Sequence, residues 1–128
     1  MTEPLVEIEG VTKRFAVAGR EVVALADIDL AIMRGECHAV VGESGSGKST
    51  LGALILGLFR PSAGTIRFEG AVLPSRRMLA HKRAIQLIQQ NPLTALNVRR
   101  TVGQSIRLGL DVHGIGERGS RDIGIRIP

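Results

Sequence analysis

Apolar and polar residues alternate in three stretches of the chain. The alternation runs through residues 6–9, residues 27–32 and residues 65–70, and a turn is expected at Gly19 and Arg20 between the first two. A period of two residues is typical of a strand with one buried face. The first two stretches therefore predict an antiparallel β subdomain near the N-terminus, and the third predicts a further strand.

Two other stretches are apolar almost throughout. They are residues 37–41, with the sequence CHAVV, and residues 84–89. A short, continuous apolar run is typical of a strand that is buried on both faces of a parallel sheet. We therefore expect two parallel core strands here, and we expect Cys37 to be a small buried residue rather than a catalytic one.

Helical periodicity is clearest after residue 47. Over residues 48–58, four apolar residues fall at the spacing of one helix face: Leu51, Leu54, Ile55 and Leu58. A shorter helix is expected over residues 75–82. Thr101 and Gln104 have the spacing of a capping box, which predicts a helix from there to about residue 110.

The composition indicates one domain with an aliphatic core. The chain has 128 residues, of which 44% are hydrophobic and only three are aromatic, all Phe. The net charge of +5 comes from scattered Lys and Arg without interleaved aromatic residues, so no nucleic-acid partner is expected. The longest apolar run, residues 51–59, is shorter than the roughly 20 residues that span a bilayer, and the N-terminus lacks a signal-peptide pattern. We therefore expect a cytosolic chain.

The sequence GESGSGKS, residues 42–49, matches the P-loop pattern G-x-x-x-x-G-K-[ST]. It stands between a predicted strand and a predicted helix, which is the setting that the motif requires. Glycines adopt backbone angles that a Cβ atom forbids, so successive N–H groups can turn inward and line a nest for an anion. The positive N-terminal end of the next helix points to the same place. The loop is therefore predicted to bind a nucleoside triphosphate.

Each polar side chain after the last glycine of the loop has a predicted role. Lys48 can reach the β- and γ-phosphates, Ser49 can offer its hydroxyl to Mg²⁺, and Thr50 can donate to the α-phosphate. The predicted nucleotide-binding residues of the loop are Gly42, Glu43, Ser44, Gly45, Ser46, Gly47, Lys48, Ser49 and Thr50. The motif alone does not say which class of P-loop protein this is.

Three segments narrow the class. The stretch VVGESGSGKSTLGALILGLFRPSAGTIRFEG resembles the ATP-binding subunit of ABC transporters, closest to the oligopeptide/dipeptide importer type. Residues 85–106 resemble the Q-loop segment and the helix after it, and residues 5–15 resemble the opening strand and the adenine-contacting loop. The resemblance covers about residues 5–114. It implies an α/β fold: a P-loop NTPase core with an incomplete parallel sheet, plus an N-terminal antiparallel β subdomain.

The resemblance also implies roles for two residues outside the P-loop. Phe15 matches the aromatic residue that stacks on adenine, although a core role for this ring is an open alternative. Gln90 matches the Q-loop glutamine, which contacts Mg²⁺ and the attacking water and senses the membrane subunit. The implied cofactors are ATP and Mg²⁺, with Ser49 and Gln90 as the metal ligands.

The sequence departs from the family pattern in several places. Gln89 replaces an apolar or aromatic residue, Asn91 stands where Asp is common, and Val98 stands where Pro usually follows Asn. These departures bear on the contact with the membrane subunit more than on nucleotide binding. The predicted organisation is a partial ABC-type nucleotide-binding domain over residues 1–114, followed by a divergent, disordered tail over residues 115–128.

The function implied is that of the ATP-binding subunit of an ABC importer for peptides, truncated and located at the inner face of the cell membrane. Its implied partners are membrane-spanning permease subunits and a second ATP-binding subunit. The sequence lacks the signature, Walker B and switch-histidine motifs, so we expect no ATP hydrolysis by this chain alone. Three alternatives stay open: another P-loop NTPase or kinase, a non-catalytic nucleotide-binding fragment, and an importer of nickel or another solute.

Overall fold

The computed structural model of the chain describes residues 3–91 and 96–114, in two compact units that divide after Lys82. The first unit contains four strands and one helix: β1 (Val6–Val17), β2 (Arg20–Ile32), α1 (Lys48–Leu56), β3 (Ala63–Phe68) and β4 (Ala71–Val72). Helix α2 (Leu79–Ala84) spans the division, and helix α4 (Val102–Val112) belongs to the second unit.

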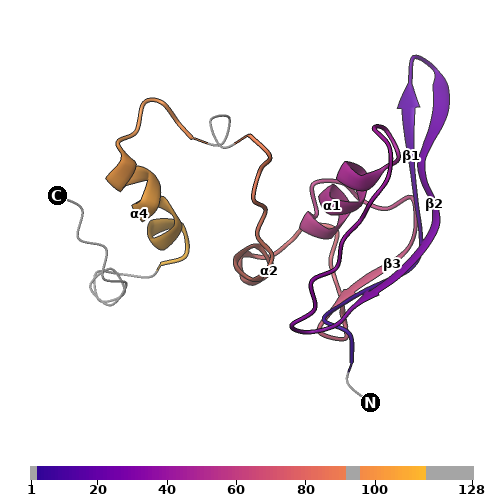
Figure 1. Ribbon diagram of the computed structural model, residues 1–128, viewed down its shortest axis with the longest axis horizontal. Coiled ribbons are helices and arrows are strands. Elements are labelled where there is room, and N and C mark those ends of the chain that lie inside the picture. The colour runs from indigo at the N-terminus through magenta and orange to yellow at the C-terminus, as the bar shows by residue number, and fades with distance from the viewer. Residues whose placement is uncertain (1–2, 92–95, 115–128) are drawn as a thin grey trace. The chain divides into compact units, whose positions relative to one another are not determined.

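The four strands form one antiparallel sheet in the order β2-β1-β3-β4 (Figure 1). Strand β1 is central, and its Val6 lies opposite Ile32 of β2 on one side and opposite Phe68 of β3 on the other. The turn that joins β1 to β2 falls at Ala18 and Gly19. The strands and the turn predicted from the alternating pattern are thus confirmed, and so is the antiparallel β subdomain.

The pairing of β1 with β2 shifts register at three places, which changes which side chains of the long hairpin face the core. In β1, Ile8 and Val11 are both buried although they are an odd number of residues apart, because the pairing shifts between them at Gly10. An extra residue in one strand moves the following side chains to the other face. The N–H of Gly10 donates to Oδ1 of Asp29 at 2.7 Å, which ties the bulge to β2. In β2, Asp27 has a positive φ. At this residue the alternation of buried and exposed side chains shifts to the other face of the strand.

The hydrophobic core of the first unit lies between α1 and one face of the sheet (Figure 1). Helix α1 contributes Leu51 and Leu54. The sheet and the loop after it contribute the other buried apolar residues: Val6, Ile8, Val11, Leu25, Ile66 and Leu73. All of these side chains are aliphatic, as the composition predicts.

Helix α1 is two residues shorter than predicted. Gly57 adopts the left-handed conformation, and its N–H donates to the carbonyls of Ala53 and Leu54, which ends the helix. As a result, Leu58 does not continue the buried face and is 68% exposed. The apolar period over residues 48–58 therefore predicted the helix correctly but placed one residue too many in the core.

The two predicted core strands are wrong. Residues 37–41 and 85–89 contain no strand. All of them except the half-buried Ile85 are exposed, with Val41 at 91% and Ile88 at 95% exposure. Cys37 is also exposed instead of buried. A central parallel strand needs hydrogen-bonded neighbours on both sides, and every strand among the described residues pairs in the antiparallel sheet. An apolar run without such neighbours remains an exposed, irregular segment.

The capping box of α4 is confirmed. Thr101 Oγ1 accepts a hydrogen bond from the N–H of Gln104 at 3.2 Å, and Gln104 Oε1 accepts one from the N–H of Thr101 at 3.0 Å. The apolar residues of α4 are not buried within the described parts of the chain. Helix α2 begins at Leu79, four residues later than predicted. None of the helices in the described ranges is long and apolar enough to cross a membrane.

The burial of α1 generates a matched pair of substitutions. Leu54→Ala should lower the free energy of unfolding by about 2–5 kcal/mol, because Leu54 is fully buried and its loss leaves a cavity. Leu58→Ala, four residues later, should change it by less than about 1 kcal/mol. Chemical denaturation of both variants measures the difference. Equal destabilisation would show that Leu58 is part of the core.

Candidate functional site

The P-loop lies immediately before α1, whose first residue is Lys48. Gly47 is the N-cap residue, and it offers no side-chain oxygen to the free N–H groups of the first turn. No described residue supplies a side-chain cap, and the first turn contains no acidic residue. The N-terminal end of α1 therefore keeps its unpaired donors and its positive partial charge, both of which attract an anion.

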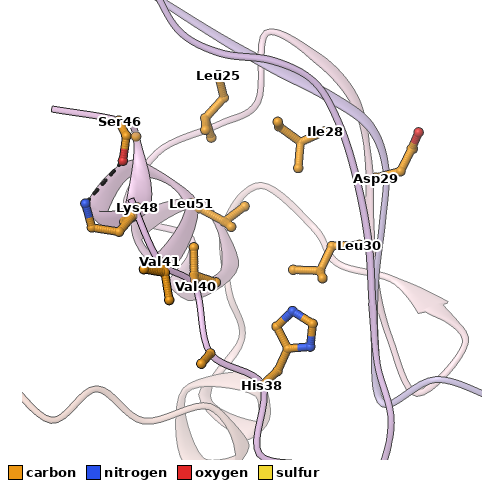
Figure 2. A pocket seen from close by; sticks show the side chains of 12 residues that line it. Leu25, Ile28, Asp29, Leu30, His38, Val40, Val41, Ser46, Lys48 and Leu51 are labelled. Atoms are coloured by element: carbon orange, nitrogen blue, oxygen red, sulfur yellow. Dashed lines mark hydrogen bonds between the residues drawn. The ribbon is translucent and has the colours of Figure 1, made fainter. Parts of the chain in front are cut away.

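The side chain of Lys48 closes the loop. Its Nζ atom donates to the carbonyl oxygen of Gly42 at 2.8 Å, to that of Glu43 at 2.5 Å and to Oγ of Ser46 at 3.1 Å. Figure 2 shows the last of these bonds at the start of α1. The N–H of Ser46 also donates to the Glu43 carbonyl at 3.2 Å. One ammonium group thus joins the beginning and the end of the loop.

Gly47 holds the loop against strand β2. Its φ of 92° lies in the left-handed region, and a Cβ atom there would lie 2.6 Å from the carbonyl oxygen of Ala24 and 2.7 Å from Cδ2 of Leu25. Gly45 shares the left-handed conformation, whereas Gly42 does not. The predicted need for glycine is therefore met by backbone geometry at two of the three positions, and at Gly47 by close packing as well.

An apolar cavity of about 370 Å³ lies beside the loop. Figure 2 shows Ile28 and Leu30 of β2 pointing into it, with Lys48 at one end and His38 at the other. The rest of the lining comes from Leu25 and Asp29 of β2, residues 39–41, Ser46 and Gly47 of the loop, and Leu51 of α1. The loop therefore borders one end of the cavity, and the wall between β2 and residues 39–41 is mostly apolar and cannot recognise phosphate.

A charged turn precedes the segment that leads to the loop. Oε2 of Glu36 accepts a hydrogen bond from the N–H of Met33 at 2.7 Å, and Oε1 of Glu36 lies 3.0 Å from Nδ1 of His38. The Met33 N–H and then the His38 ring lower the pKa of the Glu36 carboxyl group. The carboxylate therefore stays ionised at neutral pH and fixes the chain where it leaves the sheet.

Phe15 forms an aromatic pair in the first unit. Its ring packs edge-to-face with Phe59, with centroids 5.2 Å apart and planes at 80°. The ammonium group of Lys13 lies 4.8 Å from the centre of the Phe15 ring and donates to the carbonyl of Arg60 at 2.8 Å. The Phe15 ring is half-buried. The surroundings of Phe15 are therefore compatible with both hypotheses. The ring is packed against another aromatic side chain, as in a core role, and it keeps some surface that a base could cover, as in adenine stacking.

The other predicted site residues lie in two places. Ser49 and Thr50 follow Lys48 in the first turn of α1, so their hydroxyl groups start at the same end of the helix. Gln90 is exposed at a bend in the second unit, and its predicted role stays a prediction.

Sequence reasoning missed the partners of Phe15. Lys13 stands two residues earlier on the same strand, so strand alternation could have placed both side chains on one face. Phe59 follows the end of α1, and nothing in its local sequence indicates a contact with β1.

Comparison with known proteins shows which family this sequence matches. The sequence matches the ABC transporter family over residues 25–122. It is 39% identical, over 125 residues, to a Brucella ovis protein whose name assigns it to peptide import as the ATP-binding protein, covering 94% of this chain and 39% of the relative. It is 37% identical, over 121 residues, to the oligopeptide transport ATP-binding protein OppF of Bacillus subtilis, covering 91% and 40%. The chain spans about two fifths of the length of these curated relatives.

A solved protein structure has a similar fold. The structure of cbiO1 from Clostridium perfringens, part of the ABC transporter complex cbiONQ, superposes with a TM-score of 0.70 at 24% sequence identity, covering 98% of this chain and 45% of that chain. Identity at this level shows a shared fold. The predicted α/β class, with part of a P-loop core and an antiparallel β subdomain, is confirmed.

The contact of Gly47 with β2 generates a second matched pair. Gly47→Ala should destabilise the chain by on the order of 2–3 kcal/mol, because alanine is strained at this φ and its Cβ would press on the Ala24 carbonyl. Gly52→Ala, inside α1 with no atom within 4 Å of the added Cβ, should stabilise it by about 0.5–1 kcal/mol. Denaturant midpoints give both values. A Gly47→Ala variant as stable as the unaltered chain would contradict the seating of the loop on β2.

Proposed function

The chain belongs to the ABC transporter family, and from that membership we propose that it binds ATP for an importer of peptides. The observation that carries the proposal is the loop of residues 42–47, which Lys48 closes over the uncapped end of α1. The names of the relatives support peptides as the solute. The chain spans about two fifths of the length of these relatives, so transport itself is also part of the proposal.

Lys48 is the residue whose hydrogen bonds would change most directly when a phosphate group binds. In the structure its ammonium bonds two backbone carbonyls, those of Gly42 and Glu43. Phosphate oxygens are stronger acceptors because they are charged, so the ammonium would exchange the carbonyls for the β- and γ-phosphates. The N–H groups from Gly45 to the first turn of α1 would donate to the same oxygens. These N–H groups would not have to break hydrogen bonds to a capping side chain first, because no described residue caps the helix.

Two hydroxyl groups lie next to this lysine. Ser49 is exposed in the first turn of α1, and its oxygen is the kind of hard ligand that Mg²⁺ prefers. Gln90 would supply an amide oxygen as a second ligand, and Thr50 would donate to the α-phosphate. When bound, the ion would offset part of the charge on the phosphates.

Phe15 is the proposed contact for the adenine ring. Its half-buried ring retains accessible surface, and Val22 lies directly opposite it on β2, half exposed. Directly opposed residues of an antiparallel pair share one face of the sheet. Together they would give the base an apolar surface at the hairpin end of the sheet.

Transport needs groups that these 128 residues do not contain. The sequence has no Walker B carboxylate pair and no signature motif, so the groups that activate water would come from the longer protein or from a second ATP-binding subunit. We propose membrane-spanning permease subunits as the other partners, and the inner face of the cell membrane as the location.

Binding of MgATP should raise the melting temperature in a Lys48-dependent way. At a hundred times the Kd, the stabilisation is about 2.7 kcal/mol, or roughly 5–10 °C for a chain of this size. Lys48→Ala should remove most of the shift, because the ammonium is the main counter-charge in the loop. Lys82→Ala removes the same charge elsewhere and serves as the control. Calorimetry that finds the same affinity for Lys48→Ala and the unaltered chain would refute the proposal.

Substitution of Phe15 separates its two possible roles. If the ring stacks on adenine, Phe15→Ala should weaken MgATP binding by about 1–3 kcal/mol and leave the affinity for pyrophosphate unchanged. ATP and GTP should differ only modestly, because one stacked ring discriminates poorly between bases. Calorimetric titrations with the three ligands test this. A variant that melts much lower but binds MgATP normally would assign Phe15 to the core.

A further inference from the structure

Arg77 is the one charged side chain that is buried within the described parts of the chain, at 8% exposure. It lies between β4 and α2, more than twenty positions after α1. Its guanidinium donates to the carbonyl of Leu54 at 2.9 Å, to that of Ile55 at 3.2 and 3.3 Å, and to that of Pro74. Burial lowers the pKa of Arg77 from its ordinary value, but a guanidinium remains charged at neutral pH.

The position of this charge fits the end of the helix that it contacts. The last turn of a helix leaves carbonyl groups unpaired and carries a negative partial charge. Helix α1 has no basic residue in its own last turn. Arg77 supplies the missing positive charge from a distant part of the sequence. It donates to the carbonyl of Ile55 and shares the carbonyl of Leu54 with the N–H of Gly57. Gly57 makes room for it, since a Cβ at that position would lie 2.4 Å from Cγ of Arg77.

We propose that Arg77 is a positioning residue for the phosphate loop and that it acts through α1. The inference rests on the proposed function, in which this loop binds the phosphates of ATP. Helix α1 has nine residues and is therefore about 13 Å long, with Arg77 at one end and Lys48 at the other. Because a short helix moves as a rigid body, a tilt at its C-terminal end displaces the loop donors at its N-terminal end.

The contacts that hold α1 explain why Arg77 would control the orientation of the helix. The helix buries Leu51 and Leu54, which lie less than one turn apart along one side. Two neighbouring apolar contacts attach a helix to a sheet but permit it to rock about them. The fork of Arg77 bonds two successive carbonyls of α1 and also the carbonyl of Pro74 in its own loop, and it thereby opposes that motion.

The test compares Arg77→Lys with Arg76→Lys, an exposed neighbour that undergoes the same substitution. Lysine keeps the charge but cannot bond several carbonyls at once. Calorimetry with MgATP and with pyrophosphate is run at a temperature at which circular dichroism shows both variants folded. For Arg77→Lys, we expect the Kd of both ligands to rise by the same factor, about fivefold or more. For Arg76→Lys, we expect no change.

The outcomes separate this inference from the proposed function. A lower melting temperature with unchanged Kd values for Arg77→Lys would reduce Arg77 to a structural cap and overturn the inference. Absence of pyrophosphate and MgATP binding in the unaltered chain would instead overturn the proposed function. If Arg77→Lys does not fold, hydrogen exchange of the unaltered chain decides. Pyrophosphate should slow exchange in residues 54–58 and 74–78, and unchanged exchange there would contradict the coupling.

Discussion

The ammonium group of Lys48 is the point on which the loop and its surroundings depend. It hydrogen-bonds the first carbonyls of the loop and the serine hydroxyl near its end, and it thereby joins the two ends of the loop. That arrangement requires Lys48 to be the first residue of α1 and requires α1 to lie against the sheet. Gly47 allows the contact with Ala24 and Leu25, and the buried leucines of α1 maintain it.

Electrostatics at the two ends of α1 are complementary. At the N-terminal end, the uncapped N–H groups and the Lys48 ammonium together favour an anion. At the other end, the buried Arg77 guanidinium donates to the carbonyl of Ile55 and, together with the N–H of Gly57, to that of Leu54. A helix of nine residues is too short to be stable by itself, so contacts at both ends and along the buried side have to hold it. The helix is therefore as much a product of its neighbours as of its own sequence.

Local signals in the sequence predicted most of the first unit. The alternation in β1 and β2, the helix after the glycine loop and the capping box of α4 each depend on residues a few positions apart, and each is confirmed. The apolar runs 37–41 and 84–89 were misread because a parallel strand depends on distant partners, which a local pattern cannot reveal. Long-range contacts such as Arg77 with α1 and Phe59 with Phe15 escaped prediction for the same reason.

Amide chemical shifts would test the central claim, that residues 42–49 form the triphosphate site, most directly. A titration of the ¹⁵N-labelled chain with MgATP should shift the N–H signals of Gly45, Gly47, Lys48 and Ser49 most strongly, because these groups would exchange their present surroundings for phosphate oxygens. Signals from the walls of the apolar cavity, such as those of Ile28 and Leu30, should shift far less. Saturable shifts at the cavity with an unchanged loop would contradict the account.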